Sequence, residues 1–127
     1  MFALTALYAT PLVLIFLVLS WRVISYRRNA QISLGDGGDT GLTRRMRAQA
    51  NCAEYAPFGL LLLALVEAQG PAVLVHVVGA TLVAGRALHA YGFSARPPRM
   101  ELRAAGMVLT LLSMGLAAIA LPVIAIL

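Results

Sequence analysis

Four long apolar runs constrain the fold of this chain more than any other feature of its sequence. The hydrocarbon core of a bilayer is about 30 Å thick, and a helix of roughly 20 residues crosses it. The runs extend from about Phe2 to Ile24, from Thr43 to Ala68, from Pro71 to Phe93 and from Pro98 to Ile126. We therefore expect an all-α integral membrane protein, in which residues 1–127 form one bundle of four transmembrane helices.

The composition excludes several other classes of protein. The chain is 61% hydrophobic and 12% charged, whereas soluble domains are about 45–50% apolar and about 25% charged. Its net charge of +5 comes from short arginine clusters between the apolar runs, which is typical of a membrane surface, so we expect no nucleic-acid partner. The single cysteine, Cys52, excludes an internal disulfide. No Cys/His pattern predicts a metal site.

The arginine clusters also predict the orientation in the membrane. The first connection, expected from Tyr26 to Leu42, contains four glycines and is flanked by Arg27, Arg28, Arg44, Arg45 and Arg47. The third connection is flanked by Arg96, Arg99 and Arg103. The second carries Glu67 and no basic residue. By the positive-inside rule, loops one and three face the cytoplasm and both termini lie on the opposite side.

The second run carries a polar stripe. At about 100° per residue, Arg47, Asn51 and Glu54 fall on one face of a helix, and Tyr55 lies on its flank. Glu54 lies about two turns inside the span, where an unpaired carboxylate is costly. The stripe is therefore either a ligand site or a polar clasp between helices, since buried Asn and Arg–Glu pairs also join membrane helices.

Further arginines suit an acidic ligand. All ten basic residues are arginine, whose guanidinium fork matches carboxylates. Arg86, His89 and Phe93 form a stripe near the end of the third run, and Arg103 lies near the start of the fourth. With Arg27 or Arg28 and the second-run stripe, these groups suit a ligand that has two carboxylates, an ammonium group and peptide amides, such as glutathione. A guanidinium near its thiol would favour the reactive thiolate.

The segment from Arg47 to Pro57, RAQANCAEYAP, resembles the signature R-A-x-x-N-x-x-E-x-x-P of the MAPEG family, the membrane-associated proteins in eicosanoid and glutathione metabolism. The likeness covers nearly the whole chain in length and layout. It implies a homotrimer of four-helix subunits that binds glutathione between neighbouring subunits near the cytoplasmic side. On these matches, the glutathione-binding residues are Arg27, Arg47, Gln49, Asn51, Glu54, Tyr55 and Arg86, to which we add His89 from the third-run stripe.

The resemblance also implies a role in catalysis for one arginine of the fourth run. Arg103 is the best match for the arginine that stabilises the thiolate, with Arg99 as its competitor. Phe93 stands where the animal synthases of the family have a tyrosine, so the hydroxyl is missing unless Tyr91 or His89 compensates. Cys52 lies roughly opposite the polar stripe, and we expect it to be a buried small residue.

The leading prediction is a membrane-bound glutathione transferase. Glutathione would be its cosubstrate, and the second substrate would be a lipophilic electrophile or a lipid hydroperoxide in the bilayer. One alternative is a non-enzymatic member of the family that binds a lipid or a partner protein. A second alternative is a small proton-coupled drug exporter, which relies on a membrane-buried carboxylate such as Glu54.

Overall fold

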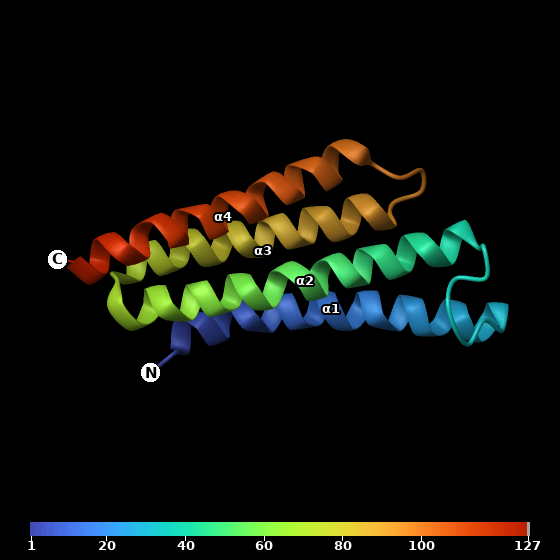
Figure 1. The fold of residues 1–127 in the computed structure, drawn as a ribbon, viewed down its shortest axis with the longest axis horizontal. Coiled ribbons are helices and arrows are strands. Elements are labelled where there is room, and N and C mark those ends of the chain that lie inside the picture. The colour runs from blue at the N-terminus through green and yellow to red at the C-terminus, as the bar shows by residue number, and fades with distance from the viewer. Residues whose placement is uncertain (127) are drawn as a thin grey trace.

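The computed structural model describes residues 1–126, which form four helices and the segments that connect them. These are α1 (Ala3–Ala30), α2 (Thr40–Gln69), α3 (Ala72–Ser94) and α4 (Met100–Ile126) (Figure 1). Each helix is long and apolar enough to cross a membrane, and the described part of the chain contains no strand. The predicted all-α four-helix membrane bundle is thereby confirmed.

The four helices run alternately up and down. The α1–α2 and α3–α4 connections lie at one end of the bundle, which we call the arginine end, and both termini lie at the other (Figure 1). Helices α2 and α3 contact each other, and each also contacts both α1 and α4. Within residues 1–126, α1 and α4 do not contact each other. They are therefore opposite edges of the protomer.

The first connection is shorter than the sequence predicts, because α1 continues to Ala30 and absorbs the start of the expected loop. Arg27 and Arg28 lie in the last turn of α1, where positive charge is favoured by the helix dipole. Gln31 then ends the helix in the left-handed conformation, with φ of 54°. Its position just after the last turn is the usual place for such a cap.

Helix α2 begins three residues before the predicted Thr43, because Asp39 caps it. The Asp39 carboxylate accepts a hydrogen bond from the Leu42 N–H at 2.9 Å and from the Tyr26 hydroxyl at 3.0 Å. These hydrogen bonds lower the pKa of Asp39, that from Leu42 most strongly. The cap fixes the end of α2 against α1 and sets the position of the arginines that follow.

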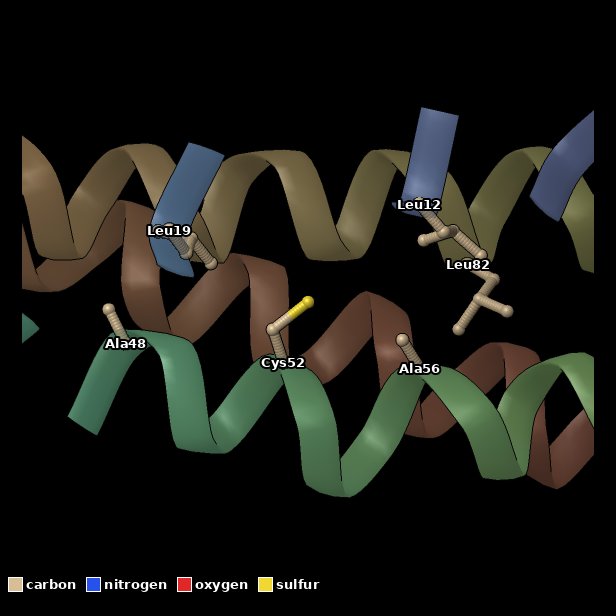
Figure 2. Packing of buried hydrophobic residues seen from close by; sticks show 6 residues of the cluster. All are labelled: Leu12, Leu19, Ala48, Cys52, Ala56 and Leu82. Atoms are coloured by element: carbon tan, nitrogen blue, oxygen red, sulfur yellow. The ribbon is translucent and has the colours of Figure 1, made fainter. Parts of the chain in front are cut away.

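The centre of the bundle is apolar. Figure 2 shows the side chains of one buried cluster, which α1, α2 and α3 share: Leu12, Leu19, Ala48, Cys52, Ala56 and Leu82. A second cluster, nearer the termini, joins α2, α3 and α4. Cys52 is a free, buried cysteine, and its position in the first cluster confirms the prediction of a small packing residue.

Helices α3 and α4 approach each other most closely. A Cβ atom placed on Gly106 would meet the His89 nitrogen and would lie 2.6 Å from the Gly85 carbonyl oxygen, so the two backbones touch there. Small residues at such a crossing allow tight packing of membrane helices. Farther along α4, the Ser113 hydroxyl donates to the Val78 carbonyl oxygen at 2.8 Å. The α3–α4 pair is thus in close backbone contact, in addition to the apolar contacts of the second cluster.

At the end with the termini, Glu67 of α2 binds the first turn of α1. Its carboxylate oxygens accept from the N–H groups of Leu4 at 2.9 Å and Thr5 at 2.6 Å. The first N–H groups of a helix have no partner within the helix, and a negative charge is favoured beside them. Glu67 therefore caps a helix other than its own.

Replacing Glu67 with glutamine is expected to destabilise the bundle by about 1 kcal/mol, and replacing it with alanine by about 2 kcal/mol. The amide keeps one acceptor oxygen but loses the second oxygen and the charge, whereas alanine loses both acceptors. Unfolding in sodium dodecyl sulfate, followed by circular dichroism, measures both changes. An alanine variant as stable as the parent would contradict this role of Glu67.

Candidate functional site

The centre of the candidate site is a buried arginine. Arg86 of α3 has only 1% of its surface exposed. Its Nε donates to the Thr110 hydroxyl of α4 at 2.9 Å, and its Nη1 donates to Oδ1 of Asn51 in α2 at 2.6 Å. The Tyr55 ring centroid lies 5.5 Å from the guanidinium carbon, close enough for a cation–π contact. One side chain thus connects three helices.

The bond from Arg86 orients the Asn51 amide. Because Oδ1 accepts from Arg86, the two hydrogens on Nδ2 are the groups that Asn51 still has to offer. The third donor group of Arg86, Nη2, meets the Met107 sulfur at 3.6 Å and no other acceptor within residues 1–126, and a thioether is a weak acceptor. Arg86 lies inside the protomer, with Asn51 between it and the outer face of α2.

The polar stripe predicted for α2 faces outward. Arg47 and Glu54 are exposed and Asn51 is half-buried. The stripe continues as apolar side chains toward the far end of α2, where Phe58, Leu61 and Leu65 are 56%, 55% and 41% exposed. The spacing of these positions alternates between three and four residues, which is the heptad spacing by which two or more helices pack together.

Near the arginine end, Phe93 of α3 lies against Arg103 of α4, and His89 packs beside Phe93. The Arg103 guanidinium carbon is 3.6 Å from the Phe93 ring centroid, and the His89 and Phe93 rings are 5.2 Å apart. The Arg103 Nη1 donates to the Met100 sulfur at 3.2 Å. Its Nε is buried and has no hydrogen-bond partner within residues 1–126. Arg103 therefore has donor capacity that the described protomer leaves unused.

The structure distinguishes Tyr91 from His89, the two residues that could compensate for Phe93, and Arg99 from Arg103, the two candidate arginines. Tyr91 is 59% exposed and lies outside the contact between Phe93 and Arg103, whereas His89 is buried beside it. Arg99 is exposed and precedes the first residue of α4. Of the two candidate arginines, Arg103 is the one in contact with the aromatic pair.

Arg27 stands apart from this cluster. Its Nη1 donates to the Gly35 carbonyl oxygen at 2.7 Å, and its Nη2 donates to the Met46 sulfur at 3.2 Å, so it folds over the first connection. Arg27 belongs to α1 and Arg103 to α4, the two edge helices. Gln49 of α2 is half-buried. The structure thus brings together Asn51, Tyr55 and Arg86, places His89 beside Arg103, and leaves Arg27, Arg47, Gln49 and Glu54 outside that core.

Sequence reasoning missed Thr110 and Met107, because α4 reads as almost wholly apolar after Arg103. A signal was present. The buried residues of α4 are Gly106, Thr110, Ser113 and Ala117, a stripe of small residues at helical spacing. Such a stripe marks the side on which a membrane helix packs closely. Among residues 1–126, no group of three His, Cys, Asp or Glu side chains is placed to hold a metal ion.

The fold and this cluster define a multi-pass membrane protein that carries an arginine-centred polar region in a bundle of four helices. The model of the MAPEG family matches residues 5–122. The chain belongs to the MAPEG family, and the family expected from its sequence is confirmed.

Two curated relatives support this assignment. The chain is similar to Inner membrane protein YecN of Escherichia coli (strain K12), with 36% identity over 93 residues, which cover 72% of this chain and 71% of the relative. The protein of the same name from Escherichia coli O6:H1 (strain CFT073) matches with the same identity and coverage. Together with the four membrane-crossing helices, these relatives identify an integral, multi-pass membrane protein.

Proposed function

We propose that the protein is a membrane-bound glutathione transferase that binds glutathione at the arginine end, between copies of the chain. The observation that carries the proposal is the pairing of Asn51 with Arg86. This hydrogen bond fixes the Asn51 amide so that its N–H donors remain free. The same outward stripe of α2 also carries a cation, Arg47, and an anion, Glu54. Such a stripe complements a peptide that carries carboxylates, an ammonium group and carbonyl oxygens.

Two further arginines support an acidic ligand. Arg27 and Arg103 each donate to a methionine sulfur, a weak acceptor that a carboxylate or thiolate would displace at little cost. Arg103 also has an unused Nε–H donor. In the proposal, Arg27 and Arg47 hold carboxylates, Gln49, Asn51, Glu54 and Tyr55 contact or orient the peptide, and His89 lines the pocket. Arg86 acts through Asn51, as a positioning residue.

The exposed stripe of α2 supports a homotrimer. Glu54 lies 15 residues from the Gln69 end of α2, about 22 Å at 1.5 Å per residue. It is therefore within a hydrocarbon core of about 30 Å that begins at that end. A carboxylate facing lipid at this depth is costly. A second copy that packs along the stripe would cover Glu54 and the apolar positions below it. The family resemblance favours three copies.

A site between copies also follows from the separation of α1 and α4. A single ligand that contacts both Arg27 and Arg103 needs these edge helices brought close, and packing of neighbouring protomers would do this. We further propose that the arginine end faces the cytoplasm, since most of the basic residues lie in the two connections at that end or in the helix ends that flank them. Glutathione would then enter from the cytoplasm, and the second substrate from the bilayer.

The proposed reaction is nucleophilic attack by glutathione. The thiol loses its proton to water, and the Arg103 guanidinium stabilises the resulting thiolate. The sulfur donates an electron pair to an electrophilic carbon, an S–C bond forms, and the leaving group departs with the electrons of its own bond. With a lipid hydroperoxide, two glutathione molecules would instead be oxidised to the disulfide, while the hydroperoxide is reduced to an alcohol and water.

Replacing Arg103 with alanine is expected to reduce the glutathione-dependent thiolate absorbance, measured by stopped-flow spectroscopy, by about tenfold at neutral pH, equivalent to a rise of about one unit in the thiol pKa. The matched control is Arg99→Ala, which removes an exposed arginine that lies just before the start of α4. The control should retain the signal.

Calorimetry with glutathione separates the proposal from its rival within the family. Glutathione binding by the parent, followed by turnover with a generic electrophile, supports the transferase. If the parent binds no glutathione, the proposal fails, and the non-enzymatic lipid- or partner-binding alternative is favoured.

In the stopped-flow experiment, an equal loss of the thiolate signal in the Arg103→Ala and Arg99→Ala variants would remove the role assigned to Arg103.

A further inference from the structure

A second arginine cluster lies at the same end of the bundle, around a cavity of about 370 Å³. The cavity is open to the outside and is lined by α1, the first residues of α2, the end of α3 and the segment that follows it. Its lining includes Arg22, Arg44, Arg45 and Arg96. None of these four arginines belongs to the set assigned to glutathione, and no acidic residue lines the cavity. We call it the arginine cavity.

The cations of the arginine cavity lack a counter-charge inside it. The charged groups that act on Arg22 are Arg45 and Arg96, both of the same sign. The neighbouring Asp39 does not line the cavity; its carboxylate interacts with Arg45, and this single negative charge is fewer than the four positive charges of the cavity. Arg22 and Arg45 are half-buried, where repulsion between like charges is stronger than in water. A bound anion would offset this repulsion.

Local contacts hold one wall of the cavity in place. The Arg45 Nη1 donates to the Gly41 carbonyl oxygen at 2.9 Å, and its guanidinium carbon lies 4.2 Å from the Tyr26 ring centroid. Thr40 and Gly41, the first residues of α2, also line the cavity. The Asp39 carboxylate already caps this end of α2, so the guanidinium groups are the donors that the cavity offers to an anion.

An apolar groove continues from the arginine cavity along the α1–α3 flank. It has a volume of about 290 Å³ and shares Leu19, Arg22 and Ser94 with the cavity. Its other lining residues are Ile15, Val18, Ala87, Ala90 and Tyr91. The groove opens on the outer surface of α1, where Val18 is 60% exposed. A charged cavity that leads into an apolar groove matches the two parts of a membrane lipid.

We propose that the arginine cavity binds the phosphate group of an anionic phospholipid, and that one acyl chain of that lipid lies in the α1–α3 groove. Several guanidinium groups bind one phosphate well, because its oxygens accept from more than one fork. The cation of a choline headgroup would be repelled by four arginines, so phosphatidylglycerol is favoured over phosphatidylcholine. Soluble phosphate shares the polar part of this chemistry but has nothing to occupy the groove.

Trp21 provides a probe for this site, because it is the one tryptophan of the chain, is 62% exposed and precedes Arg22. Bromine atoms on a lipid acyl chain quench indole fluorescence on contact. In nanodiscs of phosphatidylcholine, brominated phosphatidylglycerol is expected to quench Trp21 at about a tenfold lower mole fraction than brominated phosphatidylcholine. The double variant Arg22→Gln/Arg96→Gln is expected to lose this preference.

The matched control is Arg28→Gln, which removes the same charge from the same end of the bundle at an exposed position outside the cavity. It should keep the preference. If the double variant does not fold, Arg96→Gln alone carries the test, because Arg96 is exposed and lies outside the helices, and a partial loss is expected. The proposal is overturned by an equal preference for both lipids in the parent, or by an equal loss in the control.

A third arm separates the two sources of phosphate. Inorganic phosphate is compared with chloride at matched ionic strength in the same nanodiscs. Retention of the phosphatidylglycerol preference supports the lipid. Loss of the preference in phosphate but not in chloride would show that the cavity takes a soluble anion, and would overturn the lipid assignment. No arm uses glutathione, so the outcome is independent of the proposed transferase activity.

Discussion

Replacing Gly106 with alanine is expected to destabilise the bundle by about 3 kcal/mol or more, because it forces two helix backbones apart. The added methyl group would meet the His89 backbone nitrogen and would lie 2.6 Å from the Gly85 carbonyl oxygen and 2.8 Å from the His89 Cα. These are backbone atoms, which no change of rotamer can move. Helix α4 would have to shift away from α3 along its length.

The same helix offers a matched control. A Cβ atom on Gly115 would meet nothing within 4 Å, so Gly115→Ala should change the stability by no more than about 1 kcal/mol, with the helix propensity of alanine in its favour. Denaturation by sodium dodecyl sulfate, followed by helical circular dichroism, compares the two variants. If Gly106→Ala and Gly115→Ala unfold at the same detergent concentration, the close contact of α3 with α4 is wrong.

Asn51→Leu and Asn51→Asp are expected to separate the structural role of Asn51 from its role in binding. Leucine removes the acceptor oxygen that lies 2.6 Å from the Arg86 Nη1. The buried Arg86 guanidinium then loses its hydrogen bond to α2. This should destabilise the bundle by about 2–3 kcal/mol. Aspartate keeps an acceptor oxygen for Arg86 and adds a negative charge beside it. The aspartate variant should therefore be as stable as the parent.

Glutathione binding should respond differently. Aspartate has no N–H donors, and it places a negative charge beside a ligand with two carboxylates, so Asn51→Asp should weaken glutathione binding by at least about tenfold in a protein that remains folded. Isothermal titration calorimetry and detergent unfolding on the same samples measure the two effects. Parental affinity in the aspartate variant would show that the Asn51 amide does not donate to glutathione.

The sequence predicts the helices well, because the length and hydropathy of a membrane-crossing segment leave few alternatives. It overestimates the first loop. Glycine and aspartate favour a flexible connection from Tyr26, yet Arg27 and Arg28 continue α1 to Ala30, since the helix dipole favours them there. Hydropathy predicts too late a start for α2, because the cap by Asp39 depends on side-chain geometry that hydropathy does not contain.

The candidate site is predictable only in part. The outward face of α2 follows from helical periodicity, and the stripe of Arg47 and Glu54 lies where that periodicity places it. The partner of Arg86 does not follow, because the register of α3 against α2 and α4 is set by close contacts at glycines. The sequence therefore indicates which side chains are polar, and the packing of its small residues decides which of them meet.

The binding of the first turn of α1 by Glu67 has a consequence for how the protein enters the membrane during synthesis. The N–H groups of Leu4 and Thr5 obtain their acceptor only after the ribosome has made the second hydrophobic segment and the insertion machinery has delivered it. Until then, these two N–H groups lack the carboxylate that binds them in the folded bundle. The first turn of α1 is therefore fixed only after α1 and α2 have paired, and we expect it to fray in a chain that is stalled between the two segments.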